Sequence, residues 1–189
     1  MKTTMTNRIK TLALAVGLTL GISACTSTPD GIQPVQNFDA ERYLGTWYEI
    51  ARLDHSFEDG LSQVTAEYSR NDDGTIKVIN RGYSEEDGEW DTAEGTAKFV
   101  EGPNIGHLKV SFFGPFYGSY VIFDLDQDNY KHSFVSGPDR DYLWLLSRTP
   151  TIDADLKARF LSRAQDLGFD TDELIFVDQS ENAEKRAAD

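Results

Sequence analysis

The sequence predicts an all-β fold: an eight-stranded antiparallel up-and-down barrel with a C-terminal α-helix and a short ninth strand. Short runs in which apolar and polar residues alternate with period two begin at Thr46, which is typical of strands that bury one face. Turn-forming residues separate the runs, for example Asn-Asp-Asp-Gly at 71–74 and Asp-Gly at 87–88. The regular spacing favours a meander of hairpins over a crossed-over sandwich, although spacing alone does not exclude the sandwich. The eight expected strands are residues 46–53, 62–70, 75–83, 90–100, 107–113, 119–126, 130–137 and 141–147.

One helix is expected after these strands, because apolar residues then recur at helical spacing. Thr151 or Asp153 can cap its N-terminus, and Gly168 ends it. The next apolar run, residues 174–177, predicts the ninth strand, pairing at an edge of the sheet. The acidic and alanine-rich residues 180–189 predict a flexible tail. The apolar stripe of the helix consists of Leu156, Phe160, Leu161, Ala164 and Leu167.

Residues 1–24 have the order of a secretory signal peptide: basic residues, then an apolar run at 12–22, then small residues. The run is too short to span about 30 Å of hydrocarbon comfortably. The end of this segment, Ile-Ser-Ala-Cys at 22–25, resembles the lipobox of bacterial lipoproteins, in which the cysteine is diacylated and becomes the new N-terminus. This resemblance implies that Cys25 is the lipidation site, and that residues 25–37 form a lipidated N-terminus and linker. It also implies the outer membrane, since Thr26 stands where inner-membrane lipoproteins usually have Asp.

The composition excludes several classes of protein. The chain has 18 basic and 32 acidic residues, a formal net charge of −14, so nucleic acid is not expected as a partner. So acidic a body is not drawn electrostatically to anionic lipid headgroups either. The single cysteine excludes an internal disulfide and a CxxC zinc or redox site.

No catalytic residue, metal site or cofactor is expected. The sequence contains no Gly-x-Ser-x-Gly, His-Glu-x-x-His or Gly-rich phosphate loop. Its three histidines, His55, His107 and His132, fall in separate segments. The acidic stretch 124–129 resembles a calcium loop only superficially, because Asn129 and Val135 occupy positions that require Gly and Glu. A solvated hairpin is the better interpretation of that stretch.

Three motifs in the predicted strands resemble those of the lipocalins. Gly45 and Trp47 match the Gly-x-Trp of the first strand, and Asp126 and Tyr130 match the turn between the sixth and seventh strands. Arg148 matches the arginine at the end of the eighth strand. The resemblance covers an expected domain at residues 38–179 and extends to bacterial lipocalins, the outer-membrane lipoproteins of this family, and to apolipoprotein D. It implies a structural role for these residues, in which the Arg148 guanidinium lies across the Trp47 indole at the closed end of the barrel.

An eight-stranded barrel encloses an interior wide enough for one small ligand. Strand parity assigns one side chain in two to this interior. By parity and by resemblance to apolipoprotein D and bacterial lipocalins, the expected ligand-binding residues are Tyr68, Asn80, Phe112, Tyr120 and Trp144. The alternative is that these side chains fill the barrel as an ordinary core. The full inward set is Trp47, Glu49, Ala51, Val64, Ala66, Tyr68, Val78, Asn80, Leu108, Val110, Phe112, Tyr120, Ile122, Tyr142 and Trp144.

The connection after the fifth strand is also aromatic. In a meander that begins at the closed end, this connection lies at the open end, so Phe113, Pro115, Phe116 and Tyr117 would surround the mouth. Exposed aromatic residues at that place suit a membrane or lipid contact. The alternatives are that they fold over the entrance or form the contact of a homodimer.

Taken together, these observations predict an outer-membrane-anchored lipocalin that binds, stores or transports fatty acids, lysophospholipids or similar hydrophobic ligands without covalent chemistry. An alternative is a lipocalin-fold enzyme, isomerase-like, that acts on a hydrophobic substrate. A third possibility is a structural or stress-response envelope protein whose cavity is vestigial.

Overall fold

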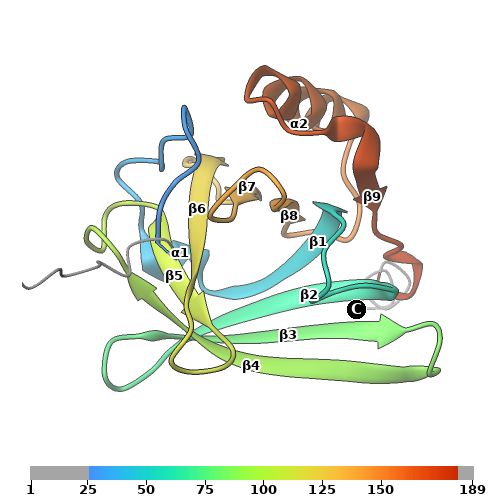
Figure 1. Cartoon of the computed structure of the whole chain (residues 1–189), viewed down its shortest axis with the longest axis horizontal. Coiled ribbons are helices and arrows are strands. Elements are labelled where there is room, and N and C mark those ends of the chain that lie inside the picture. Colours follow the sequence, from blue (N-terminus) through green and yellow to red (C-terminus); the bar gives the residue numbers. More distant parts are fainter. Residues whose placement is uncertain (1–25, 183–189) are drawn as a thin grey trace, which may run out of the picture.

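A computed structural model describes residues 26–182 of the chain. The predicted signal peptide, Cys25 and residues 183–189 of the predicted tail lie outside the described residues. Strands curl around a common interior, and a helix lies against the outside of the sheet (Figure 1). Within residues 26–182, no helix is both long enough and apolar enough to cross a membrane.

Each strand from β1 to β8 pairs antiparallel with the next, and β8 returns to pair with β1, so the barrel is closed. The predicted meander is therefore confirmed. Connections β1–β2, β3–β4, β5–β6 and β7–β8 lie at one end of the barrel, as the alternating strand directions require. The strands are β1 (Gly45–Leu53), β2 (Leu61–Arg70), β3 (Ile76–Ser84), β4 (Glu89–Phe99), β5 (His107–Ser111), β6 (Gly118–Leu125), β7 (His132–Ser136), β8 (Leu143–Ser147) and β9 (Leu174–Phe176).

Three strands are shorter than predicted because their outermost residues form turns. β5 stops at Ser111, and the residues that follow turn back through a hydrogen bond from the Phe116 N–H to the Phe113 carbonyl. Tyr130 has a φ of 55°, a left-handed conformation that does not fit a strand. β8 begins after a turn closed between Gly137 and Tyr142. Alternation of apolar residues continues into these turns, so the pattern alone overestimates the strand lengths.

The parity prediction is wrong at Ala51. The pairing of β1 with β8 shifts register between Glu49 and Ala51, and a bulge of this kind moves the following residues to the other face. Ala51 accordingly packs into the outer cluster with Phe160 of the helix, outside the barrel. Arg52 instead lies on the same side as Glu49, to which it is hydrogen-bonded.

The closed end of the barrel is built from the motif residues. Trp47 is fully buried, and the Arg148 guanidinium carbon lies 3.9 Å from the centroid of the Trp47 ring. Arg148 also donates hydrogen bonds to the backbone carbonyls of Thr46 and Leu44. This is the contact that the sequence predicts, and it ties the end of β8 to the start of β1.

The turn between β6 and β7 joins the same end. The Asp126 carboxylate accepts hydrogen bonds from the backbone N–H groups of Asn129 and Lys131. The Tyr130 hydroxyl accepts one from the backbone N–H of Asp39. Asp39 caps α1 (Ala40–Tyr43), a short helix that the sequence analysis does not predict because one turn is too short to show periodicity.

The C-terminal helix, α2 (Ala154–Asp166), begins at Asp153, whose side chain accepts a hydrogen bond from the Leu156 N–H. Its buried residues are Phe160 and Ala164, and the Phe160 ring meets Phe134 of β7 edge to face. The helix thereby buries the outer surface of the sheet, leaving the interior to other residues.

After α2 and a 3₁₀ turn (Thr171–Glu173), β9 pairs with the second half of β1, as predicted for an edge. Gln179 then lies between β1 and β2, and its side-chain amide donates to the carbonyls of Glu49 and Val64. Asn182 donates to the Gln63 carbonyl, so the first residues of the predicted tail are bonded to β2.

Candidate functional site

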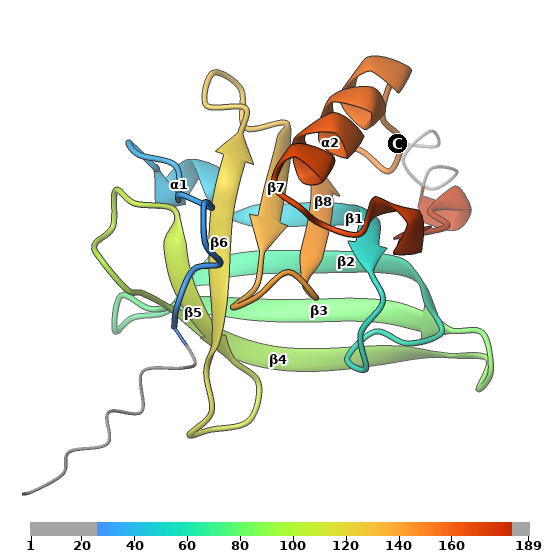
Figure 2. The same cartoon turned by 45° about the horizontal axis from the view of Figure 1, so that its top comes forward.

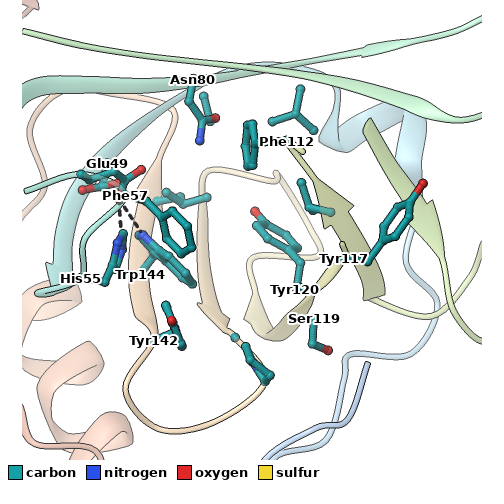
Figure 3. Close-up of a pocket in the computed structure, with 18 of the residues that line it drawn as sticks. Glu49, His55, Phe57, Asn80, Phe112, Tyr117, Ser119, Tyr120, Tyr142 and Trp144 are labelled. Atoms are coloured by element: carbon teal, nitrogen blue, oxygen red, sulfur yellow. Dashed lines mark hydrogen bonds and ion pairs between the residues drawn. The ribbon is translucent and has the colours of Figure 1, made fainter. Parts of the chain in front are cut away.

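A cavity of about 340 Å³ occupies the barrel interior. All five residues that the sequence analysis assigned to ligand binding line this cavity, namely Tyr68, Asn80, Phe112, Tyr120 and Trp144. Figure 3 shows Asn80, Phe112, Tyr120 and Trp144 directed toward one space from four different strands or loops. The interior is therefore hollow, and these side chains form a wall around it.

Aromatic side chains form the largest part of the wall, and aliphatic side chains complete it. Val64 and Ala66 of β2, Val78 of β3, Val110 and Leu146 contribute apolar surface. Small-molecule sites are commonly about 300–1,000 Å³ and predominantly apolar with a few polar groups, and this cavity lies at the small end of that range.

Three tyrosines lie toward the closed end. The Tyr120 hydroxyl is 2.9 Å from the hydroxyls of both Tyr43 and Tyr68, and Tyr43 donates to Ser133. Burial raises the pKa of Tyr43 to about 12, and burial also raises the pKa of Tyr68 and of Tyr120 well above 10.0. These hydroxyls are neutral at physiological pH and bonded to one another, so this part of the cavity carries no charge.

Asn80 is a polar group in the apolar wall. Its side-chain Oδ1 is buried and has no hydrogen-bond partner among residues 26–182. A buried carbonyl oxygen without a partner is costly, and a ligand hydroxyl or N–H could satisfy it.

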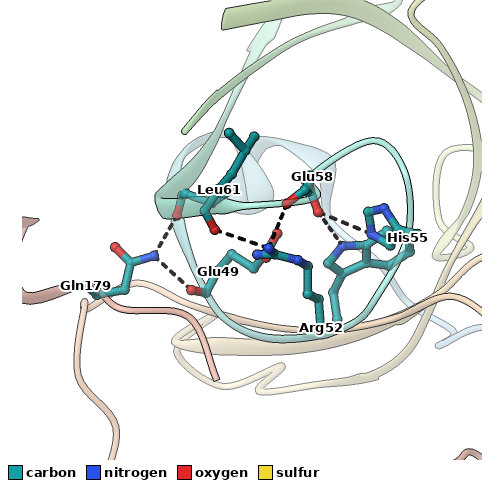
Figure 4. A network of polar contacts seen from close by, with 8 residues as sticks. Glu49, Arg52, His55, Glu58, Leu61 and Gln179 are labelled. Carbon is teal, nitrogen blue, oxygen red and sulfur yellow. Dashed lines mark hydrogen bonds and ion pairs between the residues drawn. The ribbon is translucent and has the colours of Figure 1, made fainter. Parts of the chain in front are cut away.

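A cluster of ionisable groups lies beside the cavity where β1 leads into the β1–β2 loop (Figure 4). Arg52 donates to the Glu49 carboxylate at 2.8 Å. Glu58 lies 3.2 Å from the His55 Nε2 and accepts a hydrogen bond of 3.2 Å from the Trp144 indole. Arg52 further donates to the backbone carbonyl of Glu58 at 2.7 Å, which links the loop to the strand.

The pKa values of the two carboxyl groups in this cluster, Glu49 and Glu58, are shifted in opposite directions. Burial raises the pKa of Glu49 well above its ordinary value of 4.5, the charge of Glu58 adds to this, and Arg52 opposes it. Burial alone would also raise the pKa of Glu58, but the contacts with His55, Trp144 and Arg52 outweigh it and lower that pKa. Glu58 is therefore the ionised carboxylate of the pair, and it faces the cavity.

This difference predicts a pH-dependent effect for Glu49→Gln. Above pH 4.5 the folded chain keeps the Glu49 proton while the unfolded chain releases it, so the folded state binds more protons. The contribution of Glu49 to the free energy of unfolding then falls as the pH rises, until the folded pKa is passed. Relative to the parent, Glu49→Gln is expected to gain stability as the pH rises above 4.5, by at most about 1.4 kcal/mol per pH unit. Urea unfolding at several pH values measures this, and a difference that does not change with pH would contradict it.

The loop residues of the site are not predicted from the sequence. His55, Phe57 and Glu58 all line the cavity, although their loop shows no strand or helix pattern. One usable signal was present: Glu49 and Arg52 are charged residues within an otherwise apolar strand, and such residues must find partners when buried. Tyr43 was missed because it lies on the unpredicted helix α1.

Within residues 26–182, no group of three or more His, Cys, Asp or Glu side chains is placed to hold a metal ion. The cavity lining contains neither lysine nor arginine.

A closed antiparallel barrel with an apolar cavity reached from one end defines a class of proteins that bind small hydrophobic molecules. The chain belongs to the lipocalins: residues 38–179 match the Lipocalin-like domain family.

Two relatives extend over nearly the whole chain. The chain is 59% identical to Outer membrane lipoprotein Blc of Vibrio cholerae, over 84% of this chain and 92% of that protein. It is 52% identical to Outer membrane lipoprotein Blc of Escherichia coli K12, over 91% of this chain and 98% of that protein. Among solved structures, the cockroach allergen Per a 4 superposes with a TM-score of 0.66 over 84% of this chain and 99% of that chain. Its 22% identity supports the fold alone.

Proposed function

We propose that this lipocalin is held at the outer membrane by acylated Cys25 and binds, stores or transports fatty acids, lysophospholipids or similar amphiphiles in its barrel. The cavity is the observation that carries the proposal. It has a long apolar wall, an uncharged tyrosine end and polar groups at few points. The names of the two relatives, both outer membrane lipoproteins, support the location.

The distribution of charge suggests how such a ligand would lie. Its hydrocarbon tail would occupy the apolar wall toward Tyr68 and Tyr120, where burial contributes about 0.8 kcal/mol per CH₂ before ordering costs. Its polar head would remain hydrated near the open end, because burying a charged head deeper in the cavity, whose lining contains no lysine or arginine, would be costly.

The first test is to purify the protein from membranes, extract it with organic solvent and identify the lipid by mass spectrometry. A fatty acid, lysophospholipid or comparable amphiphile, present in near-stoichiometric amount and chemically unchanged, is the expected result. Turnover of the lipid that a single polar substitution abolishes would instead support a lipocalin-fold enzyme. Failure of every lipid tested to displace a fluorescent fatty acid would support a vestigial cavity.

Trp144→Ala tests the cavity wall directly. The indole contributes apolar surface and orients Glu58, so its removal is expected to weaken binding of a fluorescent fatty acid by more than about tenfold. Trp90→Ala is the matched control, because Trp90 on β4 does not line the cavity. Equal affinity in the two variants, with both folded by circular dichroism, would remove Trp144 from the binding site.

A further inference from the structure

The mouth of the cavity carries the most exposed large apolar side chains of residues 26–182. Phe57 is 69% exposed, and Phe113 and Phe116 are each 75% exposed. All three also line the cavity, from two loops, β1–β2 and β5–β6. Aromatic rings that are this exposed and gathered around one opening mark an interaction surface, since single apolar residues on a surface are ordinarily scattered. We call Phe57, Phe113 and Phe116 the aromatic rim.

The N-terminal part of the described chain begins at the same end of the barrel. The Asp30 carbonyl accepts a hydrogen bond from Arg140, in the β7–β8 connection at the open end. From there the chain runs along β6, where the Val35 N–H donates to the carbonyl of Ile122 in the middle of that strand. It then reaches the closed end, where the Phe38 N–H donates to the Asn104 carbonyl. Figure 2 shows this segment, in dark blue, beginning on the side of the molecule where the β5–β6 loop lies. Cys25 is joined to Thr26 by one peptide bond, so an acyl anchor on Cys25 is attached to the barrel at its open end.

From these two observations we infer that the open end of the barrel lies against the lipid bilayer, with the aromatic rim in the membrane interface. The inference rests on the lipid anchor of the proposed function. Aromatic side chains favour the interface between headgroups and acyl chains, where their rings leave water. In this orientation an amphiphile passes between the leaflet and the cavity without its tail crossing bulk water.

The charges near the mouth favour a zwitterionic lipid surface as the partner. Lys98 and Lys109 lie on one side, with their ammonium groups 5.6 and 5.2 Å from the Tyr117 ring centroid. The β3–β4 hairpin on the same end is acidic, with Glu85, Glu86, Asp87 and Glu89 close together in sequence. This mixture of positive and negative charges gives no net attraction to anionic headgroups, so the anchor and the aromatic rim must hold the open end of the barrel at the lipid surface.

The inference is tested with a fluorophore at each end of the barrel. The full-length lipidated chain carrying Phe116→Cys or, as the matched control, Asp128→Cys is labelled with an NBD fluorophore and reconstituted into phosphatidylcholine vesicles. Asp128 is exposed in the β6–β7 turn at the closed end. A nitroxide on the lipid headgroup is expected to quench the label at position 116 about twofold or more, and to leave the label at position 128 unquenched. Phe113→Cys provides an independent second reading of the open end.

Quenching that is equal at the two ends, or stronger at position 128, would overturn the inference. So would self-quenching between labels at position 116 in sparsely loaded vesicles, because the aromatic rim would then contact a second copy of the chain. Control measurements on the parent chain, which has no added cysteine, distinguish these outcomes from a failure of the proposed function. If it takes up the thiol label or does not float with vesicles, Cys25 is not acylated and the anchor itself is wrong.

Discussion

Replacing Ala66 with tryptophan is expected to weaken ligand binding roughly a hundredfold while leaving the barrel folded. Ala66 lies on β2, pairs with Trp47 on one side and Asn80 on the other, and lines the cavity. An indole at this position would project into a space of about 340 Å³ and displace part of a bound acyl chain. Loss of burial for about four methylenes corresponds to about 3 kcal/mol, or roughly a hundredfold in affinity.

Titration with a fluorescent fatty acid measures this loss, and thermal unfolding shows whether the fold survives. Ala158→Trp is the matched control, since Ala158 is exposed on α2 outside the barrel. A folded Ala66→Trp variant whose affinity is the same as that of the control would mean that ligands do not enter the barrel at all.

Arg52→Met is expected to produce the largest loss of stability among the substitutions considered. Arg52 is 2% exposed, and its guanidinium bonds the Glu49 carboxylate and the backbone carbonyls of Glu58 and Leu61. Methionine fills a similar volume but leaves these acceptors without their donor. Breaking a buried charge cluster by removing one partner typically costs about 3–5 kcal/mol.

Urea unfolding at neutral pH measures the loss. Arg159→Met is a matched control because Arg159, on α2, pairs with Asp124 at a half-exposed surface position, where an ion pair contributes about 1 kcal/mol or less. If Arg52→Met lost no more stability than Arg159→Met, Arg52 would not be the residue that holds the β1–β2 loop to the barrel.

The fold was largely predictable because strand alternation is a local property. A residue that faces the interior forces its neighbours outward, and the turns between strands carry their own residue types. The same parity assigned Tyr68, Asn80 and Phe112 to the interior, where they line the cavity. Parity failed at Ala51, because the bulge in β1 depends on pairing with β8, which lies far away in the sequence.

The loop side of the site was less predictable. His55 and Glu58 lie in a connection without periodicity, and they meet Trp144 only because β8 returns beside β1. No sequence spacing encodes a contact between residues 58 and 144. The buried charges on β1 indicated that partners exist, without indicating which residues they are.

The sequence by itself determined the number and order of the strands, the capped helix, most of the inward-facing side chains and the resemblance of Cys25 to a lipoprotein anchor. All of these features are predicted by patterns that span only a few neighbouring residues of the sequence. Only the tertiary structure decided that the interior remains hollow, that Arg52 turns to Glu49, and that Asp30 and the aromatic rim share one end of the barrel. These features arise from barrel closure, which brings distant segments together according to how all the strands pack at once.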